Sequence, residues 1–586
     1  ATGLQVRCAG VEYKNFPVLE WTLYFTNTSD KATPILENIL GLDTTFERDN
    51  EGEFLLHHNE GSPHSIVTMS GPTDYRPLET RLGRGSDKPV GAKIGLPATK
   101  DFPFFNVAWA GKGVILAVGW PGQWAGRFKR DNDRKLQVSA GQELTRFKLL
   151  PGEEVRSTRI AMLFWEGDWL RGQNLWRRWM MAHNMPRPGG KLPPPQVAGG
   201  SSAYYVEMSQ ADEQSQFTFI DRYAEERIKF DYWWVDAGWH VFKDYWLNIG
   251  TWEPDPKRFP KGLRPLSDKL KAQNQKMILW FSPEAATPGT LIYNKPPDWL
   301  LGRDDERFKL VNLGNPAARE WLTDYIDKTI KEQGAGLYRH DGIPPLGYWR
   351  ANEPEDRQGI IENHYVQGYL AYWDELRRRN PNIVTDICAG GGGRNDLEGL
   401  RRAVPLWRSD YAYETTGMQN LTYGMALWVP YFGSGVSEYD MYACRSQMAP
   451  AISCIWDLRN RKLNYDFARK FLDQWRQVSE YYYGDFYPLT TYRTENDVWM
   501  AWQFNVPESG EGMVQSFRRP MSDVTTMRLR LRGLDPAARY SVTNLDLANS
   551  GGQSLPFWGS ELMEKGLPVT LSGKPESGLH VYKRIQ

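Results

Sequence analysis

The chain has 586 residues, of which 41% are hydrophobic, and its 71 Lys and Arg balance its 71 Asp and Glu to give a formal net charge of zero. A neutral chain without basic runs among its aromatic residues predicts no nucleic-acid partner. No stretch approaches the roughly 20 apolar residues that cross a bilayer, so we expect no membrane partner. A chain of this length is too long to fold around a single hydrophobic core, which predicts about two to four domains.

Four cysteines, Cys8, Cys388, Cys444 and Cys454, are too few for a disulfide framework. Cys444 and Cys454 could pair, but we expect buried free thiols. Only 8 histidines occur, with no Cys/His cluster at ligand spacing, so we expect no metal and no cofactor. The opening residues ATGLQVRC lack a signal-peptide pattern, but removal of a signal would leave the same start. The compartment and the oligomeric state therefore stay open.

The first part of the chain has the pattern of a β-domain. Apolar and polar residues alternate in runs broken by Gly, Asn, Asp and Pro, at 18–30, 113–124 and 142–155. Residues 168–184 then repeat apolar residues at three- and four-residue spacing, which predicts a helix. We expect an N-terminal β-sandwich with a linking helix over 1–184, followed by a Pro- and Gly-rich linker at 185–199.

From 200 to 484 short apolar runs alternate with helix-length segments. Amphipathic stretches at 316–334 and 364–380 are two of the expected helices. Strands alternating with helices predict a central catalytic (β/α)₈ TIM barrel. The expected strands are 202–208, 230–239, 276–284, 336–341, 383–393, 405–410, 428–435 and 452–458.

After residue 485 short β-runs return and predict a C-terminal antiparallel β-sandwich over 485–586. The expected strands there are 497–506, 525–534, 538–546, 567–573 and 578–584.

Acidic residues lie at the ends of several expected barrel strands, where barrel enzymes place their catalytic groups. Hydrolysis of a glycosidic bond needs two carboxyl groups on opposite sides of the anomeric carbon, and a spacing of about 5 Å gives retention. The strand pattern alone does not choose a pair. The candidates are Asp236, Glu284, Asp341, Asp386 and Asp410.

Tryptophan is unusually abundant, with 25 Trp against 24 Phe. An indole ring offers a flat apolar face that suits the C–H face of a sugar. Trp239, Trp252 and Trp280 are the stacking candidates, and Trp124 could reach the site from the N-terminal part. Core packing is the competing explanation for each of them.

A set of motifs in a fixed order narrows the choice among the candidate acidic residues. CAGGGGRND at 388–396 is close to the pattern CSGGGGR-x-D, and WRSD at 407–410 follows it as W-x-SD does in the same pattern. VDAGWH at 235–240 is similar to a DDGW strand end. Further matches lie at 119–124, 251–266 and 280–301. Together these segments resemble glycoside hydrolase family 36, the α-galactosidase family that shares a clan with family 27.

The resemblance implies a retaining exo-α-glycosidase acting on terminal α-galactosides through a covalent glycosyl-Asp intermediate. It places the nucleophile at Asp341 and the general acid/base at Asp410. Asp341 must be ionised to attack, and the cation of Arg339 would help if it is close. Asp410 must carry a proton at the working pH.

The resemblance also implies the sugar contacts. Asp236 would accept hydrogen bonds from the 4- and 6-hydroxyls, and Cys388 and Gly391 would contact the 2-substituent. Arg394 and Asp396 are either a structural ion pair that holds the loop or a substrate contact. The candidate substrate-binding residues are Asp236, Trp239, Trp252, Trp280, Arg339, His340, Cys388, Gly391, Arg394, Arg408 and Trp124.

Three positions depart from the family pattern. Ala237 stands where the pattern has a second Asp, and Arg339 and His340 stand where it has Lys and Trp. Loss of a carboxylate removes a hydroxyl acceptor and changes sugar selection. The reaction type is therefore a firmer prediction than the sugar.

Alternatives follow from these departures. An α-N-acetylgalactosaminidase, a transglycosylase and a non-catalytic carbohydrate-binding protein with a degenerate barrel stay open, although the presence of both catalytic Asp argues against the last. The expected partner is an oligosaccharide or glycoconjugate with a terminal α-linked galactose-type sugar.

Overall fold

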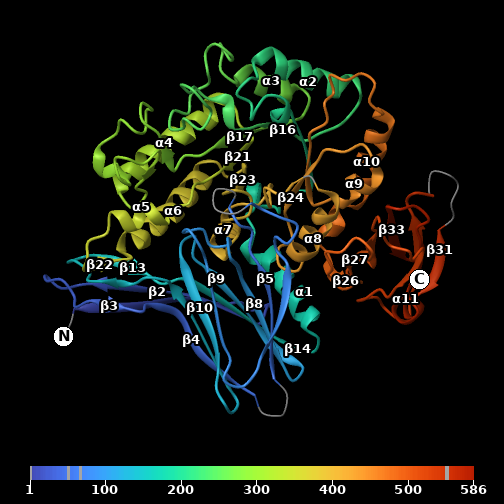
Figure 1. The fold of residues 1–586 in the computed structure, drawn as a ribbon, viewed down its shortest axis with the longest axis horizontal. Helices are drawn as coiled ribbons and strands as arrows, with labels where there is room; N and C mark the ends of the chain where they lie inside the picture. The colour runs from blue at the N-terminus through green and yellow to red at the C-terminus, as the bar shows by residue number, and fades with distance from the viewer. Residues whose placement is uncertain (1–2, 49–52, 65–68, 413, 548–553, 586) are drawn as a thin grey trace.

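The structure is a computed structural model that describes residues 3–48, 53–64, 69–412, 414–547 and 554–585. Figure 1 shows a β-rich N-terminal part, a central part in which helices surround parallel strands, and a β-rich C-terminal part. The parallel sheet at the centre is consistent with the predicted barrel.

Two large antiparallel sheets dominate the N-terminal part, and a small third sheet pairs β3, Leu36–Glu37, and β12, Arg146–Phe147, with β22, Arg357–Gln358. Among the described residues, one sheet has the order β1-β2-β14-β9-β8-β5-β6 with β13 on β2, and the other has the order β4-β11-β10-β7. Phe105 on β8 and Phe128 on β10 lie 5.2 Å apart between ring centroids, which shows that the sheets share a core. The strands are β1 Leu4–Glu12, β2 Val18–Asn27, β4 Leu40–Glu47, β5 Phe54–Glu60, β6 Pro77–Leu82, β7 Asp87–Gly91, β8 Asp101–Trp109, β9 Lys112–Gly119, β10 Trp124–Arg130, β11 Lys135–Gln142, β13 Glu154–Arg156 and β14 Arg159–Glu166.

The predicted linking helix is present as α1, Trp169–Trp179, continued by a π-helical turn at Met180–Asn184. The Asp168 side chain caps it by accepting from the Leu170 N–H at 2.7 Å. Within α1 the buried Arg177 donates to the carbonyl oxygens of Ala426, Val429, Tyr482 and Gly484. One cation thus ties the helix to two segments of the central part, one of them at its C-terminal end.

The central sheet contains seven parallel strands within the described chain, in the order β23-β21-β17-β16-β15-β25-β24. Helices α2, α3, α4, α6 and α10 lie around the outside (Figure 1). The strands are β15 Gln196–Gly200, β16 Tyr232–Val235, β17 Lys276–Phe281, β21 Leu337–His340, β23 Val384–Ile387, β24 Gly433–Val436 and β25 Ala451–Cys454. The helices are α2 Glu213–Glu225, α3 Arg264–Ala272, α4 Pro316–Gln333, α6 Ile360–Arg379 and α10 Tyr465–Val478.

An irregular segment takes the place of the strand predicted at 405–410. Val404 donates to Thr385 O at 2.9 Å, and the Gly433 N–H donates to Pro405 O at 2.8 Å, so the segment joins β23 to β24 and completes the ring. A regular strand does not form because Pro405 has no N–H and the Leu406 N–H binds the Asp386 carboxylate at 2.7 Å.

The first barrel strand also differs from its prediction. It lies at 196–200, across the C-terminal end of the linker predicted at 185–199, whereas the expected strand at 202–208 is a short 3₁₀ turn and a loop. A buried parallel strand needs small residues where aromatic neighbours crowd it, and a Cβ at Gly199 would lie 3.2 Å from the Trp233 ring. The aromatic residues that suggested a strand belong to the loop.

The C-terminal part holds two antiparallel sheets in its described ranges. One has the order β26-β27-β28-β33-β30-β31, and the other pairs β29 with β32. All five predicted strands are present, and β26, β28 and β31 are additional. The strands are β26 Asp485–Pro488, β27 Trp499–Val506, β28 Glu511–Arg518, β29 Thr526–Leu529, β30 Arg539–Asn544, β31 Leu555–Trp558, β32 Leu567–Thr570 and β33 Glu576–Arg584.

All four cysteines are free, so the alternative of a Cys444–Cys454 disulfide is wrong. The prediction that the thiols are buried is correct for three of them, while Cys8 is exposed. In the described ranges no helix is both long enough and apolar enough to cross a membrane. The same ranges contain no group of three or more His, Cys, Asp or Glu side chains arranged to hold a metal ion.

Candidate active site

A cavity of about 460 Å³ opens at the carboxyl ends of the central strands. Four carboxylates line it, from Glu207, Asp236, Asp341 and Asp410, together with the cation of Arg339. The other lining residues are His64, Gly200, Ser202, Ala203, Trp234, Ala237, Trp246, Leu247, Ile249, Trp280, Ser282, Gly342, Ile343, Cys388, Gly390, Trp407, Ser453 and Ile455. The two predicted catalytic residues therefore share one cavity.

Asp341 directly follows β21, and hydrogen bonds fix both of its carboxylate oxygens. The Gly342 N–H donates to Oδ1 at 2.9 Å, and the indole N–H of Trp280 donates to Oδ2 at 3.2 Å. The backbone N–H of Asp341 donates to Phe281 O at 2.8 Å and continues the ladder with β17. Donors on both oxygens hold the carboxylate in one orientation, as a nucleophile requires.

Arg339 is a buried cation beside this carboxylate. It donates to Asp386, and its guanidinium lies 4.6 Å from the centroid of the Trp234 ring. Burial alone would lower the pKa of Arg339, but the surrounding acidic groups raise it overall. The completely buried Asp386 is thus a structural partner of Arg339 and of the irregular segment at 404–406 rather than a reacting group.

The N-terminal part holds the segment that carries Asp410. The Ser409 hydroxyl donates to Asp74 at 2.5 Å, and the Tyr411 N–H donates to Ser409 Oγ at 3.0 Å. The Tyr75 hydroxyl donates to the Arg408 carbonyl oxygen. Burial raises the pKa of Asp74 to about 6, against the lowering effect of the hydrogen bonds that Asp74 accepts from Ser409, Gly71 and Ser62.

The glycine run packs against the same segment. A Cβ at Gly391 would lie 2.5 Å from Ser409 Cα, and one at Gly392 would lie 1.6 Å from the Tyr75 hydroxyl. The prediction that Gly391 contacts the sugar is therefore not supported, because Gly391 faces Ser409 while Gly390 lines the cavity. Cys388 does line the cavity as expected, and burial raises the pKa of its thiol, so it is a neutral group.

Two of the three predicted stacking tryptophans are core residues. Trp239 and Trp252 are completely buried, and neither lines the cavity. The Trp239 indole donates to the Trp280 carbonyl at 2.7 Å, and the Trp252 ring lies 5.7 Å from the Trp280 ring. Both therefore support Trp280, the one stacking candidate of the three that lines the cavity.

His340 and Arg394 belong to a buried network and not to the cavity wall. Glu284, which follows β17, binds His340 Nε2 at 2.6 Å and Arg394 at 3.0 Å, and it also accepts from Tyr365. Neither His340 nor Arg394 lines the cavity, which gives no support to their expected substrate contacts. Arg394 pairs with Glu284 instead of Asp396, which caps helix α7, Leu397–Arg402, by accepting from Gly399 N at 2.8 Å.

We expect Glu284→Ala to lower the free energy of unfolding by about 3–5 kcal/mol, because it leaves the Arg394 cation buried without its partner. Burial alone would raise the pKa of Glu284, but Arg394 and His340 lower it from 4.5 to about 2. The carboxylate therefore stabilises the fold above pH 4.5, and this contribution is lost as the pH falls toward 2. Denaturant unfolding at pH 7 and pH 3 measures both effects. Glu332→Ala, in the exposed pair with Lys328, is the control and should change little.

Arg408 and Trp124 also point away from the cavity. Arg408 donates to Thr422 Oγ1 at 2.9 Å and to the Met418 carbonyl, and Trp124 donates to Pro97 O at 2.8 Å inside the N-terminal part. The N-terminal part contributes His64 to the cavity instead. A Cβ at Gly390 would lie 2.6 Å from the His64 ring, so this glycine makes room for it.

The sequence does not single out Glu207, His64 or Trp246. Each lies in a loop outside the matching motifs, where a lone acid, histidine or tryptophan carries no pattern. Asp236 is in the cavity as predicted, with the Ala237 N–H donating to its carboxylate at 2.9 Å. Burial raises the pKa of Asp236, although Arg339 lowers it.

Trp280→Phe removes the indole N–H from Asp341 and keeps an aromatic ring. We expect kcat to fall roughly 10- to 100-fold with little change in KM, since a hydrogen bond to a charged group contributes about 1.5–3 kcal/mol. Trp246→Phe is a matched control, because the Trp246 N–H has no hydrogen-bond partner among the described residues. Steady-state kinetics should show an unchanged Trp246 variant, and equal losses in both would contradict the assignment.

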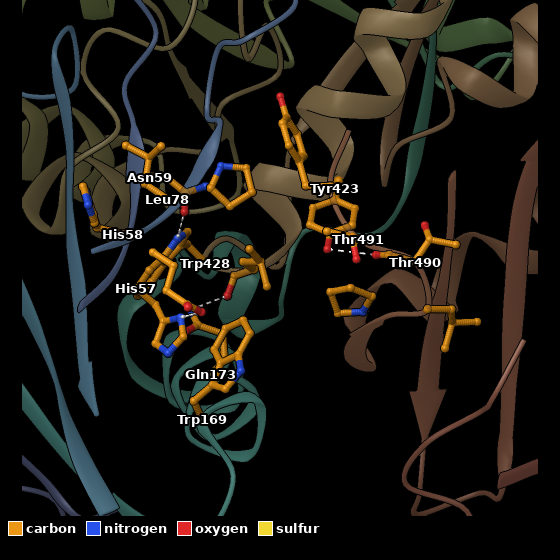
Figure 2. Close-up of a pocket in the computed structure, with 16 residues that line it drawn as sticks. His57, His58, Asn59, Leu78, Trp169, Gln173, Tyr423, Trp428, Thr490 and Thr491 are labelled. Atoms are coloured by element: carbon orange, nitrogen blue, oxygen red, sulfur yellow. Dashed lines mark hydrogen bonds and ion pairs between the residues drawn. The ribbon is translucent and has the colours of Figure 1, made fainter. Parts of the chain in front are cut away.

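A second cavity, of about 550 Å³, lies between the N-terminal part, α1 and the start of the C-terminal part (Figure 2). His57, Trp169 and Gln173 lie on one side, and Thr490 and Thr491 on the other. Among its described lining residues Glu79 is the one carboxylate. Since glycoside hydrolysis needs a pair, the cavity at the strand ends is the candidate active site.

A barrel sheet with paired carboxylates in one cavity at its carboxyl edge defines a glycoside-hydrolase type of site. The chain matches the family model Melibiase over residues 210–438 and the model of the glycosyl hydrolase family 36 C-terminal domain over residues 499–581. The predicted resemblance to glycoside hydrolase family 36 is confirmed.

Curated relatives agree with this family assignment. An α-galactosidase of Lactobacillus acidophilus is 23% identical and is matched across 94% of this chain and 76% of its own length. The α-galactosidase AgaA of Geobacillus stearothermophilus is 27% identical, but the match spans 57% of this chain and 48% of AgaA.

Solved structures show the same fold at low identity. The crystal structure of AgaA superposes with a TM-score of 0.85 at 18% identity and covers 100% of this chain and 82% of AgaA. The α-galactosidase of Lactobacillus brevis gives a TM-score of 0.84 at 16% identity, covering 100% of this chain and 80% of that one.

Proposed function

We propose that this chain is a retaining exo-α-glycosidase that hydrolyses terminal α-galactosides. The observation that carries the proposal is one cavity at the barrel edge lined by both Asp341 and Asp410. The relatives named above are α-galactosidases, and crystal structures of substituted forms of AgaA hold stachyose and raffinose. These names and complexes support a galactose-type sugar as the substrate.

In the proposed first step a carboxylate oxygen of Asp341 attacks the anomeric carbon while Asp410 gives its proton to the glycosidic oxygen. The bond between the anomeric carbon and that oxygen breaks, and the leaving group departs as an alcohol. The product is a β-linked glycosyl ester of Asp341. The indole N–H of Trp280 and the Gly342 N–H hold the attacking carboxylate of Asp341 in place.

In the second step the Asp410 carboxylate takes a proton from water, and the water oxygen attacks the anomeric carbon. The ester bond to Asp341 breaks, and the sugar leaves with its α-configuration retained. Asp410 is protonated again, so the cycle closes. Asp236, at the neighbouring strand end, would accept hydrogen bonds from hydroxyls of the bound sugar.

The test is hydrolysis of an aryl α-galactoside beside an aryl α-N-acetylgalactosaminide, with NMR of the first-formed sugar. We expect turnover of the galactoside and initial release of the α-anomer. Initial release of the β-anomer would contradict the retaining mechanism. Faster turnover of the acetamido sugar would favour an α-N-acetylgalactosaminidase, and binding without turnover would favour a carbohydrate-binding protein.

A further inference from the structure

Glu207 lines the cavity from the loop between β15 and α2, and the proposed reaction does not use it. Its backbone is unusual, because Val206, Glu207 and Met208 have φ values of 46°, 51° and 69°. Residues with a Cβ adopt this left-handed region at an energetic cost, and such residues cluster at functional sites. The surrounding structure must therefore hold this loop in place.

Two contacts hold the loop against the turn that follows β16. The Gly238 N–H donates to the Glu207 carbonyl oxygen. Arg258 donates to the carbonyl oxygens of Met208, at 2.9 Å, and of Gly238, at 2.7 Å. A Cβ at Gly238 would lie 2.5 Å from Glu207 O, so only glycine permits this approach. The backbone of Glu207 is thus fixed beside the turn that carries Asp236 and Ala237.

The side chain of Glu207 shares its surroundings with the reacting groups. Burial raises its pKa to about 7, and the nearby charge of Asp236 adds to the shift, while Arg339 opposes it. Asp410 and Asp341 contribute in the same direction as Asp236. Ala237 offers no polar group next to Asp236. Glu207 is therefore an additional carboxyl group on the Asp236 side of the cavity.

We infer that Glu207 is a specificity-determining residue, whose carboxylate accepts hydrogen bonds from a hydroxyl of the sugar that Asp236 also binds. The inference rests on the proposed function and names the part of the sugar that the cavity selects. The acceptor that Ala237 does not supply comes from another loop. The hydroxyl is the 4- or the 6-hydroxyl, and substrate analogues distinguish the two.

The test uses Glu207→Ala and Glu207→Gln with an aryl α-galactoside and its 4-deoxy and 6-deoxy analogues. Glu207→Ala should lower kcat/KM on the parent by roughly 10- to 100-fold, mainly through KM. On the analogue that lacks the contacted hydroxyl, the loss should be about twofold or less. Glu207→Gln should retain part of the activity. An unchanged kcat/KM on the parent, or the same loss on all three substrates, would overturn the inference.

Val206→Ala is the matched control for the backbone, because Val206 shares the left-handed conformation and does not line the cavity. It should match the wild type in kinetics and in thermal midpoint, and a loss equal to that of Glu207→Ala would overturn the role of the carboxylate. Calorimetric titration with galactose separates the two proposals. If the wild type binds galactose without turnover, the proposed reaction fails, and weaker binding by Glu207→Ala still supports the inference while unchanged binding overturns it.

Discussion

Replacement of Asp341 by glycine should lower kcat for an aryl α-galactoside by roughly 10,000-fold or more. The variant loses the group that forms the covalent bond, whereas the rest of the cavity wall keeps its contacts. Trp280 and Gly342 lose only an acceptor that lies at the cavity surface. The thermal midpoint should therefore change little, which separates a catalytic loss from unfolding.

Azide should restore turnover of this variant, because the missing carboxylate leaves space for a small anion. The anion attacks from the side that Asp341 occupied, so the product should be the β-glycosyl azide, identified by NMR. Asp341→Asn is the control, since it is inactive in the same way but leaves no space. An Asp341→Gly variant with wild-type turnover would contradict the nucleophile assignment.

Asp410→Ala should show a loss that depends on the leaving group. A substrate with a poor leaving group needs the proton, and its kcat should fall roughly 100- to 10,000-fold. A substrate with an activated aryl leaving group should still form the glycosyl-enzyme, which then accumulates because no general base activates water. A burst of released aryl alcohol in stopped-flow measurements would report this accumulation.

Azide should accelerate the Asp410→Ala variant as well, but with the opposite anomer as product. The anion attacks the β-linked glycosyl ester, so it yields the α-glycosyl azide. The two variants thus give different azides only if the residues act in successive displacements. An Asp410→Ala variant whose kcat falls equally on all substrates, or that gives no azide product, would contradict the acid/base assignment.

The sequence predicted the central strands where burial on both faces leaves an uninterrupted apolar run, as in β16 and β17. The sequence-based prediction failed where contacts with other segments of the chain decide the local structure. The loop at 202–208 has strand-like residues but left-handed backbone, held by Arg258 and Gly238. The segment at 405–410 loses two ladder donors to Pro405 and to the Asp386 carboxylate, which no local pattern reveals.

For the site, the order of motifs located the acidic strand ends but not their burial. His340 lies on a strand next to Asp341, yet period-two alternation turns it to the other face, where it binds Glu284. Trp239 follows Asp236 closely but packs beneath Trp280. Glu207 and His64 reach the cavity from loops, and only the folded chain brings them to it.

The most direct test of the account is identification of the residue that bears the sugar during turnover. A slowly hydrolysed fluorinated α-galactosyl fluoride should trap the glycosyl-enzyme, and mass spectrometry of the digested protein locates the label. The proposed mechanism predicts one sugar per chain, attached to Asp341. A label on Asp236, Asp410 or Glu207, or turnover of the fluoride with no covalent adduct, would contradict it.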